Sequence, residues 1–146
     1  MAPSTATVVL DTSVLTAPVQ AGVRLFEELD RVAPGDRVVP APVVDELESL
    51  ADDGEPARAA SVGRDLVDRC RVVDARAEYA DDAVVELATG SVPADTTGPV
   101  ADGETVALSS PRYAATNDRG LRDRLLSRDV RVIGLRGANT LAVTEP

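Results

Sequence analysis

Histidine is absent from this chain of 146 residues, and lysine is absent too, since all 15 basic residues are arginine. Without histidine the chain cannot form a Ser-His-Asp triad or most zinc sites. Without lysine it cannot form a phosphate-binding P-loop or a Schiff base. The single cysteine, Cys70, excludes an internal disulfide and leaves a metal-thiolate site without partners. Any chemistry must therefore depend on carboxylates, hydroxyls, arginine or a hard metal ion.

Long apolar runs are missing as well. No run approaches the roughly 20 residues needed to span a bilayer, and no signal peptide is expected at the start. We therefore expect a cytoplasmic protein without a membrane partner. Apolar residues still make up 44% of the chain, enough to bury a core in one domain over residues 1–146.

The chain has few aromatic residues, three in all, and an excess of acids, with 25 acidic side chains against 15 basic ones. Such a composition resembles that of proteins adapted to molar cytoplasmic salt, as in halophilic archaea, where acidic surfaces serve solubility. Surplus aspartate is expected for that reason alone. The role of any particular aspartate must therefore be argued from its position.

Short β-branched runs alternate with helical patterns along the chain. Strands are expected at 7–10, 37–40, 71–73, 112–116 and 130–133. Helices are expected at 19–33, 42–50, 55–70, 79–88 and 117–128, with a polar surface loop at about 90–103 and a short tail at the end. This alternation predicts βαβ units and an α/β fold with a parallel sheet.

Acidic residues stand where ligands of open α/β sheets bind, just beyond the carboxyl ends of strands. Asp11 follows the first expected strand and Asp118 the fourth, while Glu46 borders the apolar face of a helix. Asp81 and Asp82 fall near the start of another helix. Each position alone also has a structural explanation, since aspartates cap helices and complement their dipoles, and Glu46 suits a solvated boundary.

The joint arrangement of these acids favours a metal ion. Carboxylates brought together without cations repel one another and raise each other's pKa values. Ligation by carboxylates and water suits Mg²⁺ or Mn²⁺. Such a cluster can activate a water molecule and stabilise the charge of a phosphodiester under attack.

Four segments resemble, in order and spacing, the successive motifs of PIN-domain nucleases: VVLDTS at 8–13, VVDEL at 43–47, YADD at 79–82 and ATNDR at 115–119. The resemblance covers nearly the whole chain. It implies a small α/β domain whose five-stranded parallel sheet is ordered 3-2-1-4-5, with strands one and four side by side. Segments 79–82 and 130–136 look most like the archaeal and eukaryotic branch that processes ribosomal RNA.

The resemblance implies a metal-dependent endoribonuclease with Mg²⁺ or Mn²⁺ as cofactor. The acids implied to be catalytic and to bind metal are Asp11, Glu46, Asp81 and Asp118. Asp82 is a further candidate ligand, and which member of the 81–82 pair faces the site stays open. Ser13 and Thr116 would orient water or carboxylates, and Asn117 would flank the site.

Arginine is concentrated towards the carboxyl end. Residues 112–146 carry seven arginines against four acids, whereas residues 1–111 carry eight against 21. The asymmetry indicates a face that contacts RNA phosphates, with pairing to Asp123 on a helix surface as the alternative. The arginines that would form this face are Arg119, Arg122, Arg124 and Arg128. With so few aromatics, base stacking is a poor candidate for recognition.

Two other functions stay open beside RNA processing. One is a ribonuclease toxin of a toxin–antitoxin pair, and the other is a non-catalytic PIN scaffold that binds RNA or protein. RNA is the expected partner, and a second copy of the chain, pre-ribosomal proteins or an antitoxin are further candidates. A receiver domain would need lysine, and a haloacid-dehalogenase-like phosphatase would need an acid at Ser13.

Overall fold

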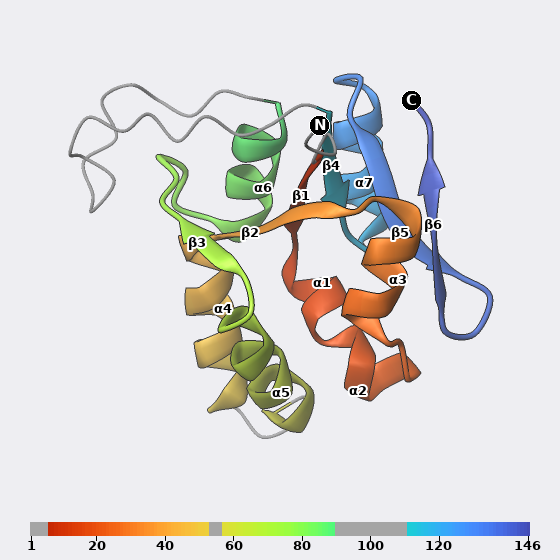
Figure 1. Cartoon of the computed structure of the whole chain (residues 1–146). Coiled ribbons are helices and arrows are strands. Elements are labelled where there is room, and N and C mark those ends of the chain that lie inside the picture. The colour runs from red at the N-terminus through yellow and green to blue at the C-terminus, as the bar shows by residue number, and fades with distance from the viewer. Residues whose placement is uncertain (1–5, 53–56, 90–110) are drawn as a thin grey trace, which may run out of the picture.

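The computed structural model describes residues 6–52, 57–89 and 111–146, and these residues form one six-stranded sheet (Figure 1). The strands lie in the order β3-β2-β1-β4-β5-β6. Their bounds are β1 Ala6–Leu10, β2 Gly35–Pro40, β3 Arg71–Val73, β4 Arg112–Ala115, β5 Arg131–Arg136 and β6 Thr140–Thr144. The first five are parallel, which confirms the expected α/β class and the order 3-2-1-4-5. The sixth strand was not expected.

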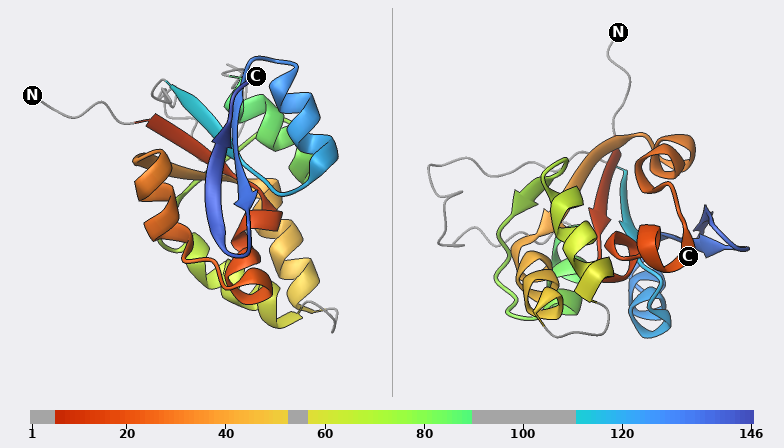
Figure 2. Two further views of the ribbon diagram at one scale, coloured as in Figure 1. Left: turned by 90° about the vertical axis from the view of Figure 1, so that its right-hand side faces the viewer. Right: turned by 90° about the horizontal axis from the view of Figure 1, so that it is seen from below.

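Helices cover both faces of the sheet, as the left-hand view of Figure 2 shows, with α3 on one side and α6 and α7 on the other. Their bounds are α1 Thr12–Leu15, α2 Ala17–Ala21, α3 Leu25–Val32, α4 Ala41–Ala51, α5 Ala57–Val67, α6 Ala80–Ala88 and α7 Arg119–Leu126. None of the described helices combines the length and apolarity needed to cross a bilayer. The expected loop at 90–103 lies outside the described residues.

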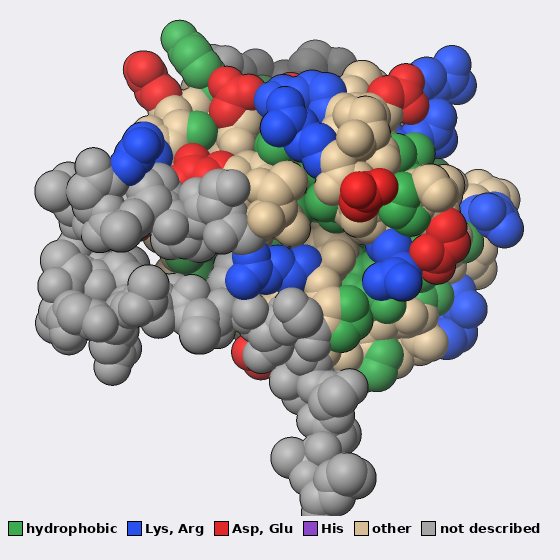
Figure 3. Space-filling view, turned by 90° about the horizontal axis from the view of Figure 1, so that it is seen from above, with side chains coloured by type: hydrophobic (Ala, Val, Ile, Leu, Met, Phe, Trp, Pro, Cys, Tyr) green, Lys and Arg blue, Asp and Glu red, His purple; other side chains and the backbone are tan. Residues whose placement is uncertain are grey.

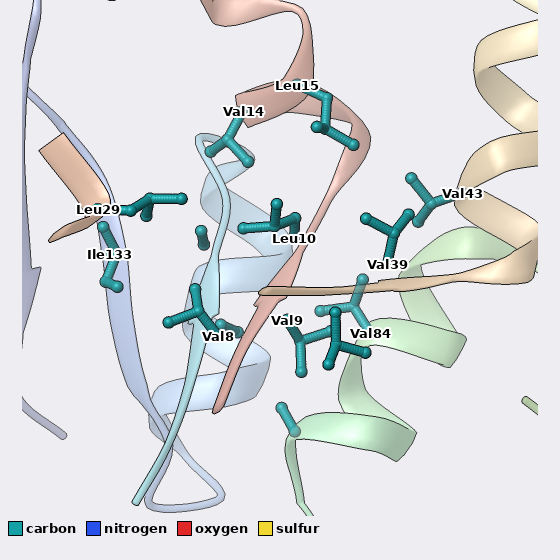
Figure 4. Close-up of a cluster of buried hydrophobic side chains, with 14 of the residues drawn as sticks. Val8, Val9, Leu10, Val14, Leu15, Leu29, Val39, Val43, Val84 and Ile133 are labelled. Atoms are coloured by element: carbon teal, nitrogen blue, oxygen red, sulfur yellow. The ribbon is translucent and has the colours of Figure 1, made fainter. Parts of the chain in front are cut away.

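Strand β1 is buried along its whole length, because both of its faces meet helices. On one face Val9 lies beside Val84 of α6, and on the other Leu29 of α3 lies beside Ile133 of β5 (Figure 4). All four side chains are at most 1% exposed. A continuous apolar strand of this kind delivers the residue after it, Asp11, to the carboxyl edge of the sheet.

The single helix expected at 19–33 is instead two helices, α2 and α3. Gly22 lies between them with φ of +68°, a left-handed conformation that ends α2 and that glycine adopts without steric cost. Buried Val23, Phe26 and Leu29 still follow the spacing that predicted one long helix. The spacing of apolar residues therefore predicted the buried face correctly, and Gly22 is the reason that the helix is interrupted.

The expected short tail is wrong, because the chain turns at Gly137 (φ +71°) and returns as β6, antiparallel to β5. Side chains of α3 hold the new strand through the backbone of Leu141. Arg31 Nη2 donates to the Leu141 carbonyl at 2.6 Å, and the Leu141 N–H donates to Glu28 Oε1 at 2.9 Å. Arg31 and this backbone N–H also hold the pKa of Glu28 below its usual value.

Helix α5 approaches α1 closely at Gly63. A methyl group there would lie 2.9 Å from the backbone oxygen of Leu15 and 3.2 Å from Leu47 Cδ2. Gly63 is buried, so the absence of a side chain lets α5 pack against the turn that follows Asp11.

We expect Gly63→Ala to lower the free energy of unfolding by about 1–2 kcal/mol, because the added methyl must push α5 away from the Leu15 backbone. Urea unfolding followed by circular dichroism measures the change. Ser61→Ala, on the exposed side of the same helix, is the matched control and should be neutral or slightly stabilising. A Gly63→Ala protein as stable as the wild type would contradict the close approach.

Candidate active site

Four carboxylates predicted to form the site come from four different elements near the carboxyl edge of the parallel strands. Asp11 directly follows β1 and caps α1, Asp118 caps α7 after β4, Glu46 lies on α4, and Asp81 lies in the first turn of α6. The right-hand view of Figure 2 looks towards this edge from below. We call these four residues the acid cluster.

Electrostatics shows that the acid cluster is close enough to interact. Partial burial raises the pKa of the Asp81 carboxyl above its usual value, and the charges of Asp11, Asp118 and Glu46 raise it further. The guanidinium of Arg124 acts in the opposite direction. Asp81 therefore lies within electrostatic range of the other three acids of the cluster.

Asp11 is the buried member of the cluster, with 4% of its surface exposed. Its Oδ2 accepts hydrogen bonds from Ser13 Oγ at 2.9 Å and from Thr116 Oγ1 at 2.8 Å. Because a buried carboxylate is costly without such donors, the two hydroxyls compensate for the burial of Asp11 and fix its orientation. Both of these bonds use Oδ2 rather than Oδ1.

The same two hydroxyls join the turn after β1 to the turn after β4. Ser13 Oγ accepts the N–H of Asn117 at 2.8 Å, and Thr116 Oγ1 accepts the N–H of Asp118 at 3.0 Å. Each hydroxyl gives its one proton to Asp11 and accepts one backbone proton, so both are satisfied. Ser13 and Thr116 thus have the orienting geometry that the sequence suggested.

Asn117 ties this network to the next strand. Its Oδ1 accepts the N–H of Leu135 in β5 at 2.8 Å, and its Nδ2 donates to Ser13 O at 3.5 Å. The residue expected to flank the site therefore braces the turn that carries Asp118.

Thr12 is a site residue that the sequence analysis missed. Its hydroxyl donates to Oε1 of Glu46, which joins the first turn of α1 to α4. Its place between two residues already singled out, Asp11 and Ser13, was the only signal available in the sequence.

The structure separates the two aspartates at the start of α6. Asp82 Oδ1 accepts from Arg124 Nη2 at 2.9 Å, an ion pair that links α6 to α7. Asp81 instead has its pKa raised, first by burial and then by the charges of Asp11, Asp118 and Glu46. Both aspartates line a pocket with Glu46, but only Asp82 is paired with a described arginine.

A pocket of about 500 Å³ opens beside Glu46 and Asp81, and Tyr79 forms part of its wall. Tyr79 is 68% exposed, although it is a large aromatic side chain. The sequence analysis took it only as part of a motif. Its exposure next to the acids became evident from the structure.

The donor set of the acid cluster fits a hard cation, since it consists of carboxylate oxygens with Arg124 as the one described cation acting on Asp81. The side chains are not drawn together as a finished metal site. Within 6–52, 57–89 and 111–146, no three acidic or cysteine side chains converge closely enough to hold an ion. Glu46 is turned towards Thr12, and Asp118 Oδ1 accepts from the N–H of Leu121 at 3.0 Å.

The four arginines expected to contact RNA lie in different surroundings. Arg124 pairs with Asp82 on the side of α7 that faces α6, whereas Arg119 and Arg122 line a pocket against β5 and β6. Arg128 is exposed beyond the end of α7. The structure does not place the four on one continuous face.

A family model described as a PIN like domain matches residues 8–99 of the chain. Among solved structures, the chain is similar to one described as the PIN domain endonuclease Utp24. The two share 21% sequence identity and a TM-score of 0.66, and the match covers 96% of this chain and 92% of that chain. No curated protein matches the chain. At this identity, the similarity to the solved structure supports the fold alone.

The raised pKa of Asp81 predicts how stability depends on pH when no metal is present. Its ionised form is disfavoured in the folded chain, so the folded state loses stability as pH rises through the Asp81 titration. In EDTA at pH 7 we expect Asp81→Asn to be modestly more stable than the wild type, and this gain should disappear at acidic pH. Thermal unfolding across a pH series measures both effects.

Asp82→Asn is the matched control for that experiment. It removes the ion pair with Arg124 rather than a repulsion, so it should be neutral or slightly destabilising at pH 7. If both variants gained equal stability, general relief of the −10 net charge would explain the effect, and the assigned position of Asp81 would be wrong.

Proposed function

We propose that this chain, which belongs to the PIN-like domain family as its motifs predicted, is a metal-dependent endoribonuclease. The observation that carries the proposal is the acid cluster around buried Asp11, in which three carboxylates from three other elements act on Asp81. Such mutual repulsion is relieved by a cation, and all-oxygen ligands favour Mg²⁺ or Mn²⁺.

In this proposal the residues that would hold the metal are Asp11, Glu46, Asp81 and Asp118. A bound Mg²⁺ or Mn²⁺ would supply charge for the phosphodiester under attack and lower the pKa of a water molecule. Ser13 and Thr116 keep Asp11 oriented through their hydrogen bonds to its Oδ2. To bind the metal, Glu46 must give up the hydrogen bond that it accepts from the Thr12 hydroxyl. In this proposal Asp82 stays paired with Arg124 and contributes no ligand.

The bond changes follow from hydrolysis of a phosphodiester. The oxygen of water forms a bond to phosphorus, and the bond from phosphorus to the 3′ oxygen breaks. The water gives up a proton to solvent, and the leaving 3′ oxygen takes one up. The products are a 5′-phosphate and a 3′-hydroxyl, the ends implied by the resemblance to PIN-domain nucleases.

The biological role that we propose is RNA maturation in the cytoplasm, on ribosomal RNA or another structured RNA. The support is the similarity of segments 79–82 and 130–136 to the ribosomal-RNA processing branch. A second copy of the chain or pre-ribosomal proteins are the proposed protein partners. The toxin and scaffold functions become outcomes of the experiment below.

We expect Asp11→Asn and Asp118→Asn each to lower the rate of RNA cleavage by at least about 100-fold, because each removes a charge from the metal-binding set. Asparagine caps helices as well as aspartate does, so the folds of α1 and α7 should persist. Cleavage of single-stranded and structured RNA in molar KCl with Mn²⁺, and then with EDTA, measures the effect.

Asp45→Asn is the matched control, since Asp45 is exposed on α4 directly before Glu46 but lies outside the acid cluster. It should cleave RNA at the wild-type rate. Cleavage that persists in EDTA, or in both cluster variants, would contradict the proposal. Absence of both RNA cleavage and metal binding would favour the scaffold, and growth arrest on expression, relieved by a small partner protein, would favour the toxin.

A further inference from the structure

A second pocket, of about 240 Å³, lies between the start of α7 and the β5–β6 hairpin. Three arginines line it, Arg119 and Arg122 from α7 and Arg136 from the end of β5. None of the described residues that line it is acidic. In a protein with a net charge of −10, a pocket with three guanidinium groups and no described carboxylate in its lining is suited to an anion.

Two of these arginines are free to bind a ligand. No ion pair with a described residue is recorded for Arg119 or Arg136, and both are exposed. Arg122 has only Asp123 nearby, with Nε 3.7 Å from Oδ1, which is too far for a hydrogen bond. Its Nε is buried and has no hydrogen-bond acceptor within the described ranges.

Several other arginines of the described chain are instead paired with acids. Arg31, Arg37, Arg64, Arg124 and Arg131 each pair with a carboxylate. On the face where the parallel strands begin, Figure 3 shows basic and acidic side chains interspersed over the described surface. The 240 Å³ pocket departs from that pattern.

The pocket adjoins the acid cluster directly. Thr116 and Asn117 belong to its wall, and Thr116 also donates to Asp11. Gly134 allows this proximity, because a methyl group there would lie 3.0 Å from the backbone oxygen of Thr116. The arginine pocket and the acid cluster therefore share Thr116 as a common wall residue.

We propose that Arg119, Arg122 and Arg136 form a subsite for an RNA phosphate adjacent to the one that is cleaved. The proposal rests on the proposed function for the identity of the polymer, but the pocket itself is defined by charge and geometry alone. Guanidinium groups bind phosphate oxygens through paired N–H donors. The subsite would hold the RNA backbone without reading its sequence. It also brings positive charge beside a cluster of carboxylates that otherwise repels RNA.

The test is binding of a labelled single-stranded RNA 12-mer, measured by fluorescence anisotropy in EDTA over a series of salt concentrations. We expect Arg122→Gln/Arg136→Gln to weaken binding at least about tenfold. The slope of log affinity against log salt should also become shallower by about 1.4, since each lost contact with a single-stranded phosphate changes it by about 0.7. A merely structural defect would not change that slope in this way.

Arg58→Gln/Arg71→Gln is the matched control, because it removes the same charge from two exposed arginines for which no ion pair is recorded in the described chain. It should change affinity less than twofold and leave the salt slope unaltered. Arg136→Lys, which keeps the charge but loses the forked donor, should fall between wild type and Arg136→Gln.

Equal losses in the pocket and control variants would overturn the subsite in favour of diffuse attraction. The absence of any RNA binding by the wild type, or of any effect of the pocket variants, would overturn it as well. These outcomes are separate from the cleavage test, which is performed with Mn²⁺. If the wild type cleaves RNA and Arg122→Gln/Arg136→Gln binds RNA as well as the wild type does, the proposed function stands and the subsite is wrong. If the wild type binds RNA through the pocket but does not cleave it, the subsite stands and the proposed function is wrong.

Discussion

Burial of the Asp11 carboxylate is the constraint on which the rest of the site depends. A charge withdrawn from water must be compensated by donors, and the only side-chain donors described for it are the hydroxyls of Ser13 and Thr116. Those hydroxyls meet only if the turns after β1 and β4 are side by side, which requires β1 and β4 to be neighbours in the sheet. The strand order and the electrostatics of the site are thus consequences of one another.

Helix α7 separates two kinds of charge environment. On one side Arg124 meets Asp82 and links the helix to α6, close to the acids. On the other side Arg119 and Arg122 face the β5–β6 hairpin, away from any described carboxylate in the pocket lining. A helix that follows β4 can therefore both hold Asp82 and offer cationic groups elsewhere, because successive arginines point to different sides of it.

Much of this arrangement could be predicted from the sequence, because some signals are local. The apolar run before Asp11 and the Thr-Asn-Asp segment before α7 place acids at strand ends in any parallel sheet. The order of the parallel strands came from resemblance to the PIN-domain nucleases rather than from composition. Asp81 and Asp82 are adjacent and chemically identical, so only the position of Arg124 in three dimensions distinguishes them.

What the sequence analysis missed depends on contacts between distant residues or on a single backbone angle. Gly22 interrupts a helix whose apolar period continues past it, so periodicity alone could not show the break. Strand β6 is short, and it is held by Glu28 and Arg31 more than 100 residues earlier in the chain. Arg136 became a candidate phosphate-binding residue only because β5 extends to it and packs beside α7.

The hydrogen bond from Thr116 to Asp11 joins residues 105 positions apart. Residues so distant meet only after a long loop has closed, which costs chain entropy before any contact repays it. Although β1 is made before β4, its central place in the sheet leaves one side open until β4 has been synthesised. The carboxylate on which the site depends is thus enclosed long after it is made. A nascent or truncated chain lacking residues beyond 115 has no assembled site, so any activity would begin only after Thr116 and Asp118 have been added.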